Sequence, residues 1–243
     1  ALPLAEPFGA LDANAPEMVG TLDMMTEMTT SESAVQAWAD QRKAKGLPTD
    51  DAWFWMSYVS LPKISHNANI FLRQDDIPNF LRFWMNAYAT MVGADGRLWE
   101  HWHLGGFAPC ETPDNGTAGW FMENFRNLLV MEEGDTLWVA RATPRAWLEQ
   151  GKKISVRNAP TYFGDLAYEI SSDADHGSIR ATIEIPTRKA PAAIRLRFRH
   201  PDGKSIRRVR VDGRPWKDFD RSQEVIRLHG LSGTVRVEAF YSR

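Results

Sequence analysis

Hydrophobic residues recur at two different spacings along this chain, and the spacing changes near residue 131. Up to about residue 130, apolar residues lie three and four positions apart, which predicts amphipathic helices. From Met131 onward, apolar and polar residues alternate in short runs, which predicts strands. We therefore predict an α+β protein with two domains, a helical domain over residues 1–130 and an antiparallel β-sandwich over residues 131–243.

The helical part contains about six predicted helices joined by short connections, which favours antiparallel helix hairpins. The third is expected to carry Val59 and to end before Pro62, and the fifth to be capped by Asp76 and to end at Gly93. The six are expected to begin at or near Pro16, Thr29, Asp50, Lys63, Asp76 and Thr117.

The second part contains short alternating segments separated by turn residues, as in a sandwich with one apolar face per sheet. The turns are predicted at 201–203, 212–213 and 231–233. The predicted strands contain residues 135–142, 166–170, 179–185, 194–198 and 235–241.

Charge is divided unevenly between the two parts, although the net charge of the chain is only −2. Residues 1–150 carry 10 Lys/Arg and 20 Asp/Glu, a net charge of −10, whereas residues 151–243 carry 19 and 11, a net charge of +8. Nine of the ten tryptophans also lie in the first part, which supports two domains of different construction. Cys110 is the only cysteine, so an internal disulfide is excluded.

Composition narrows the classes of partner. No apolar run approaches the roughly 20 residues that cross a bilayer, so we expect no membrane partner. The polar positions of one predicted strand are Arg195, Arg197 and Arg199, but this row lacks interleaved aromatic residues and the helical part is acidic. We expect these arginines to meet the acidic domain or solvent, and we expect no nucleic acid partner.

The segment from Leu98 to Trp120 differs from the rest of the helical part. It contains three tryptophans, two histidines and two glutamates, and its glycines and prolines break any helix. We predict a long shaped loop, the kind of element that often carries binding or catalytic residues. Tryptophan faces stack on sugar rings, so the expected ligand is a carbohydrate.

Carboxyl groups in this segment suggest acid/base chemistry. Glu100 stands between Trp99 and His101, and partial desolvation by indole rings would raise its pKa and suit it to donate a proton. Glu111 is the candidate second carboxyl, whereas Asp114 has a turn-forming alternative. Glycoside hydrolysis needs two carboxyls separated by roughly 5 to 5.5 Å for retention or 6.5 to 9.5 Å for inversion.

Histidines and amides complete the candidate site. On an extended segment the spacing of His101 and His103 places both on one side, but we expect hydrogen-bonded histidines rather than a metal site, and no cofactor. His66 and Asn67 are candidates for recognising sugar hydroxyls, whereas Tyr162 is expected in the core. The predicted substrate-binding residues are Trp99, His101, Trp102, His103, Trp120, Asp114, His66 and Asn67.

The order of helical hairpins, the WEHWH loop and then the stretch from Leu128 to Ile170 resembles the C-terminal part of bacterial six-hairpin, (α/α)-toroid glycosidase-like proteins. The resemblance implies a partial α/α toroid followed by a β-sandwich, in a carbohydrate-active enzyme outside the cytoplasm, periplasmic or extracellular. It also implies that Glu100 and Glu111 perform the acid/base work. A complete toroid has about twelve helices, so we expect a second copy of the chain or an N-terminal segment to cover the apolar flanks.

Two functions remain open on the sequence. The first is a glycoside hydrolase, or its C-terminal portion, acting on a polysaccharide or oligosaccharide. The alternative is a noncatalytic glycan-binding or assembly module that needs a partner to complete the toroid. A metal-dependent enzyme using His101 and His103 is a weaker third possibility.

Overall fold

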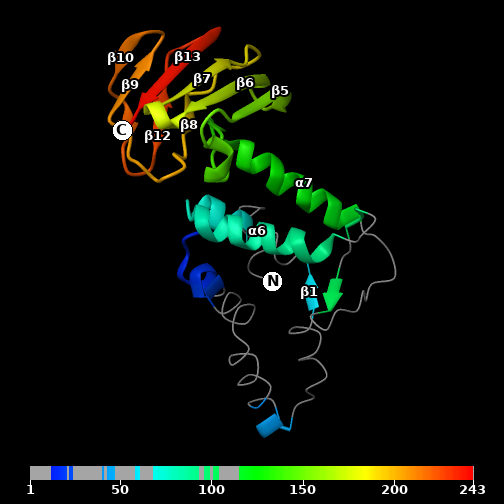
Figure 1. Cartoon of the computed structure of the whole chain (residues 1–243). Coiled ribbons are helices and arrows are strands. Elements are labelled where there is room, and N and C mark those ends of the chain that lie inside the picture. Colours follow the sequence, from blue (N-terminus) through cyan, green and yellow to red (C-terminus); the bar gives the residue numbers. More distant parts are fainter. Residues whose placement is uncertain are drawn as a thin grey trace. The chain divides into compact units, whose positions relative to one another are not determined.

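The computed structural model describes residues 12–20, 22–23, 40, 43–46, 58–60, 68–92, 96–98, 101–103 and 115–242. The chain divides into two compact units, Ala1–Asn124 and Phe125–Arg243, and the helix α7 runs from one into the other (Figure 1). The protein is a mixed α+β chain in which helices precede two β-sheets. Among the described residues, no helix is both long and apolar enough to cross a bilayer.

The described core of the first unit combines aliphatic and aromatic side chains on helices. The helix α6 (Ile77–Met91) begins where the sequence predicts, because Asp76 Oδ1 accepts the backbone N–H of Asn79 at 3.2 Å and caps the first turn. On its buried side Trp84 stacks on Phe80 at 6.5 Å and on Phe121 of α7 at 5.7 Å. These stacked pairs join α6 to α7 within the first unit.

Three local predictions for the first unit are wrong. Val59 belongs to the strand β1 (Tyr58–Ser60) rather than to a helix, since its backbone pairs with that of Trp102. The helix α7 (Asn115–Leu129) begins two residues before the predicted cap, so Thr117 is a buried residue of its first turn. Part of the predicted loop is also a strand, β2 (His101–His103), because β1 supplies a pairing partner that is distant in sequence.

The second unit contains a six-stranded antiparallel sheet, in the order β10-β9-β13-β7-β6-β5 (Figure 1). Its strands alternate as predicted, with positions such as Val235, Val237 and Ala239 buried and the residues between them more exposed. The strands are β5 (Lys153–Thr161), β6 (Gly164–Asp173), β7 (Ser178–Glu184), β9 (Arg208–Val211), β10 (Arg214–Trp216) and β13 (Thr234–Phe240).

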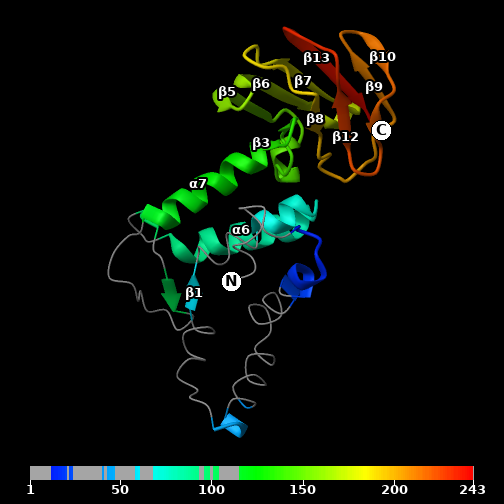
Figure 2. The same ribbon diagram turned by 180° about the vertical axis from the view of Figure 1, so that it is seen from behind.

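A five-stranded sheet, in the order β11-β12-β8-β4-β3, forms the other layer and can be followed from behind in Figure 2. The sequence predicts an antiparallel sandwich, and this sheet departs from the prediction because β4 pairs parallel to β8. The connection between these two strands contains β5, β6 and β7 of the other sheet, and such a long crossover permits parallel pairing. The strands are β3 (Val130–Glu133), β4 (Thr136–Val139), β8 (Ala193–Arg197), β11 (Phe219–Asp220) and β12 (Val225–Leu228).

The two sheets enclose one apolar core, to which both contribute their inward positions. Leu137 and Leu196 come from the smaller sheet, and Ile170, Ile183 and Val237 from the larger. Two short 3-10 helices, η1 (Arg145–Leu148) and η2 (Ala174–His176), connect strands at the border of this core. A continuous core of this kind explains why the alternating sequence pattern predicts the second unit well.

The arginine row of β8 is not a solvated face. Arg197 and the following Arg199 are buried, and they donate hydrogen bonds to the carbonyl oxygens of Arg141 at 3.1 Å and Thr143 at 3.0 Å. The Trp138 ring lies under three guanidinium groups, those of Arg141 at 4.4 Å, Arg195 at 5.1 Å and Arg197 at 5.2 Å. These arginines therefore contribute to internal packing.

Candidate functional site

The part of the predicted site that the structure describes is a two-stranded antiparallel ribbon. In β1 and β2, Ser60 lies opposite His101, and Tyr58 lies opposite His103. Because alternate residues of a strand belong to the same face, these four positions share one face of the ribbon, and Val59 and Trp102 share the other. The backbone at His101 and His103 is extended, as that prediction requires, and the placement of the two imidazoles stays a prediction.

The helix α6 supports this ribbon. It contacts both β1 and β2, and Val92, which directly follows the helix, forms a bridge with Leu98. Leu98 and His101 thus each pair with another segment, and they flank Trp99 and Glu100 in the sequence. The N-terminal end of the candidate segment is thus joined by a backbone bridge to the residue that directly follows α6.

The other predicted site residues fall into two groups. Trp120 lies in the second turn of α7, half-buried, and its carbonyl oxygen accepts a hydrogen bond from the Asn124 side chain at 3.0 Å. Six predicted residues lie outside the described residues: His66, Asn67, Trp99, Glu100, Glu111 and Asp114.

Within the described residues there is no cluster of three or more His, Cys, Asp or Glu side chains that could hold a metal ion. The side chains of His101 and His103 are outside that description, so a metal site at the ribbon is judged from the number of ligands that the two residues can supply. Two imidazoles alone fall short of the three or four protein ligands that zinc sites use.

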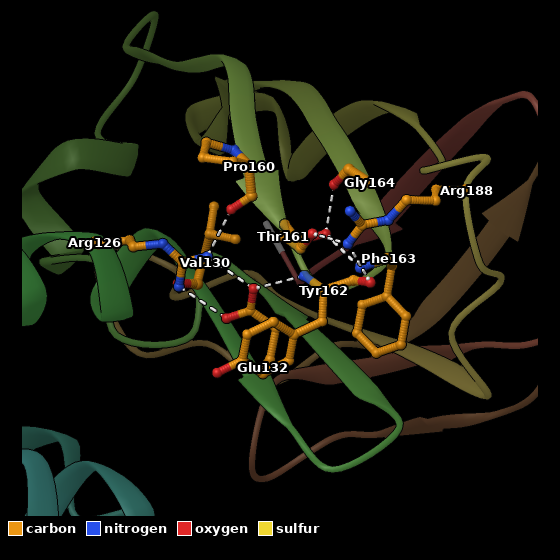
Figure 3. A network of polar contacts seen from close by, with 9 residues as sticks. All are labelled: Arg126, Val130, Glu132, Pro160, Thr161, Tyr162, Phe163, Gly164 and Arg188. Atoms are coloured by element: carbon orange, nitrogen blue, oxygen red, sulfur yellow. Dashed lines mark hydrogen bonds and ion pairs between the residues drawn. The ribbon is translucent and has the colours of Figure 1, made fainter.

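A second arrangement, which the sequence did not predict, lies in the second unit around the turn between β5 and β6. Arg126 of α7 forms a two-pronged ion pair with Glu132 of β3, with both N to O distances at 2.8 Å (Figure 3). The same guanidinium donates to the carbonyl oxygens of Val130 at 3.1 Å and Pro160 at 2.8 Å. One arginine therefore joins the helix, the β3 strand and the end of β5.

Glu132 is the buried centre of this network, with a side chain that is 7% exposed. Burial by itself would raise the pKa of Glu132, but the hydrogen bonds and charge of Arg126 and the N–H of Tyr162 at 3.2 Å outweigh it. The net result is a pKa below the ordinary value. Glu132 is thus held as a carboxylate that orients the turn.

Arg188 fixes the other side of the turn. Its guanidinium donates to the carbonyl oxygens of Thr161 at 3.1 Å and Tyr162 at 2.8 Å (Figure 3). Gly164 follows with φ of +116°, and a Cβ there would lie 3.2 Å from Arg188 Cβ, so only glycine fits without strain. The turn is consequently held by contacts from three separate segments.

Tyr162 projects from this fixed turn, and its side chain is exposed, contrary to the core position expected from the sequence. It is 73% exposed, whereas the neighbouring Phe163 is 1% exposed and belongs to the core. The alternation of the hairpin places one aromatic residue inward and one outward, and sequence alone did not indicate which. A pairing of Arg126 and Arg188 with backbone carbonyls has no sequence signal that could have revealed it.

Comparison with known proteins gives a distant resemblance. No protein-family model matches the chain, and no curated protein matches it. A solved glycoside hydrolase is similar with a TM-score of 0.42 and 12% identity, covering 77% of this chain and 33% of that one. The GH127 β-arabinofuranosidase BT3674 is similar with a TM-score of 0.43 and 13% identity, covering 77% and 32%. The chain spans about a third of these structures, and the expected resemblance holds only as distant similarity to part of them.

Proposed function

We propose that this chain is the C-terminal part of a glycoside hydrolase whose saccharide site is formed by the segment from Leu98 to Trp120. The observation that supports the proposal is the register of the β1–β2 ribbon, which groups Ser60, Tyr58, His101 and His103 on one face. Hydroxyl and imidazole groups donate and accept hydrogen bonds, as recognition of sugar hydroxyls requires. Trp99 and Glu100 directly precede this strand in the sequence.

In the proposed reaction Glu100 is the general acid and Glu111 the second carboxyl. Glu100 protonates the glycosidic oxygen as the bond to the anomeric carbon breaks, and Glu111 acts as nucleophile or activates water. The sugar would be positioned by the other predicted site residues, namely His101, His103, Trp120, Trp99, Trp102, Asp114, His66 and Asn67. The residues of the chain supply this chemistry without a cofactor.

A partner is part of the proposal. The helical unit carries exposed apolar side chains, Met85 of α6 at 47% and Met122 of α7 at 60%. Such residues become buried when another helix covers them. We propose that a second copy of the chain or a preceding segment completes a partial α/α toroid and covers these residues.

The test is a screen of natural polysaccharides with product analysis, performed on protein of known molecular mass in solution. Glu100→Gln should abolish hydrolysis while sugar binding persists, because the amide cannot donate the proton but fills the same space. Glu17→Gln, in the described helical residues 16–20, is the matched control and should keep full activity. Full activity of Glu100→Gln would remove Glu100 from the mechanism.

One observation favours the noncatalytic alternative, namely the exposed Tyr162 on a turn that three segments hold in place. An exposed aromatic ring on a fixed turn can stack on a sugar without any carboxyl pair nearby. Under this alternative the wild-type chain binds glycans without cleaving them, and the binding depends on aromatic residues and not on Glu100. The same screen separates the two functions.

A further inference from the structure

A groove in the second unit, remote in sequence from the segment 98–120, carries an excess of positive charge. It has a volume of about 580 Å³, within the range of pockets that bind small ligands. Its lining includes the ends of β7, β9 and β13, with the side chains of Asp173, His176, Arg180, Arg207, Arg208 and Phe240.

Strand register explains why these side chains converge. Phe240 of β13 pairs with Arg208 of β9 on one side and with Ser178 of β7 on the other. Glu238, two residues earlier on the same face, pairs with Arg180 of β7. All these positions alternate with the buried core residues, so they share the outward face of the six-stranded sheet.

The guanidinium of Arg208 is held in place by an aromatic ring. Its central carbon lies 4.2 Å from the centroid of the Phe240 ring, and Arg210 approaches the same ring at 5.7 Å. A guanidinium supported by an aromatic ring can still bind a carboxylate in a two-pronged manner through its N–H donors. Arg208 is therefore positioned to bind an anion.

The acidic groups near the groove are already matched. Glu238 pairs with Arg180 at 2.7 Å, and Asp173 pairs with His176 at 2.6 Å. The hydrogen bond from His176, followed by that from Gln150, holds the pKa of Asp173 below its ordinary value. Arg207 and Arg208 form no ion pair with any residue in the described part of the chain, and both are exposed.

We propose that this groove binds an acidic saccharide, with Arg207 and Arg208 forming ion pairs to the carboxylates of uronic acid residues. The anionic part of the proposal rests on the two arginines, whereas the saccharide part rests on the proposed function. Nucleic acid is disfavoured, because the Phe240 ring is covered by Arg208 and is not free to stack on a base.

The test measures binding of the whole chain to polygalacturonate, to an uncharged galactan and to single-stranded DNA, by titration calorimetry at low and moderate salt. The wild type should bind polygalacturonate more tightly than the other two, and more weakly as salt rises. Arg207→Glu with Arg208→Glu should weaken that binding about tenfold or more, since two charge-assisted contacts become repulsive. Arg207→Lys with Arg208→Lys should fall between, because the charge remains without the planar donors.

The control is Arg221→Glu with Arg214→Glu, which makes the same change of charge at exposed positions that do not line the groove. It should lower the affinity less than twofold. Equal losses in the two double variants, or no binding of polygalacturonate by the wild type, would overturn the site. Equal or tighter binding of DNA would overturn the saccharide assignment.

Failure of this proposal can be told apart from failure of the proposed function. Glu100→Gln should leave polygalacturonate binding at the groove unchanged, and the glutamate variants at the groove should retain hydrolysis of short uncharged substrates. All the groove variants change exposed side chains, so the urea midpoint of each should lie close to that of the wild type and confirm folding.

Discussion

The turn at Tyr162 and the groove at Arg208 both combine arginine with an aromatic residue, yet they do so in opposite ways. At the turn, Arg126 and Arg188 direct their N–H groups to backbone carbonyls and to Glu132, and the Tyr162 ring is left exposed. At the groove, Arg208 covers the Phe240 ring, and its own N–H groups are left exposed.

The difference shows which group each surface offers to a ligand. A guanidinium whose donors are satisfied by the protein acts as a structural clamp, and what it holds in place at the turn is the backbone from which an aromatic ring projects. A guanidinium supported by an aromatic ring keeps its N–H donors for an outside partner. The turn therefore offers a stacking surface for a neutral ring, and the groove offers charge for an anion.

The largest expected effect comes from breaking the clamp, by which we mean the network of Arg126, Glu132 and Arg188 that holds the turn at Tyr162. Glu132→Ala leaves the Arg126 guanidinium and the Tyr162 N–H without their carboxylate, so the free energy of unfolding should fall by about 2–4 kcal/mol. Urea unfolding followed by circular dichroism measures this change. The matched control is Glu169→Ala, which removes a half-exposed strand glutamate paired with Lys153 and should cost less than about 1 kcal/mol. Similar losses in both variants would show that the clamp is no stronger than a surface ion pair.

The next effect concerns the glycine that closes the turn. Gly164→Ala should lower the free energy of unfolding by about 1–3 kcal/mol, because φ of +116° strains any Cβ and Arg188 stands 3.2 Å away. Gly213→Ala is the control, since its φ of +78° is also left-handed but nothing lies within 4 Å of a Cβ there. The same urea titration compares the two. A larger loss at Gly213 would mean that Arg188 yields easily and does not fix the turn.

Features of the fold that depend on neighbours in sequence were predictable, whereas those that depend on distant partners were not. The start of α6 follows from Asp76, and the strands of the six-stranded sheet follow from residues alternating every second position. The parallel pairing of β4 with β8 and the strand β2 depend on partners far along the chain. No local pattern indicates them.

The same distinction applies to the sites. The shared face of His101 and His103 follows from their spacing once the segment is extended. The turn from which Tyr162 projects is held by Arg126 and Arg188, which lie 36 and 26 positions away from Tyr162 along the printed sequence. The roles of Glu100 and Glu111 stay predictions of residue chemistry.

Acid should destabilise the wild type by protonating Glu132, and it should not do so in Glu132→Gln, whose side chain is neutral at every pH. The pKa of Glu132 is lower in the folded chain than its ordinary value of 4.5, so its carboxylate stabilises the fold above that pH. The contribution is lost as the pH falls through the folded pKa. The free energy of unfolding of the wild type should therefore decrease more steeply below about pH 4.5 than that of Glu132→Gln, as urea titrations across this range will show. Parallel curves for the two proteins would assign the acid sensitivity to other carboxyls.

The smallest effect on stability is expected at Tyr162, because the clamp binds its backbone whereas its ring is exposed. Tyr162→Ala removes a ring that is 73% exposed while the N–H and C=O that Glu132 and Arg188 bind remain, so the free energy of unfolding should change by less than about 0.5 kcal/mol. If the ring is a stacking surface, glycan affinity should fall several-fold in this variant and be retained in Tyr162→Phe, which keeps the ring and loses only the hydroxyl. Loss of stability without loss of glycan binding would instead show that the Tyr162 ring is a part of the clamp. The turn would then offer no stacking surface to a ligand, and only the groove at Arg208 would remain as a binding surface.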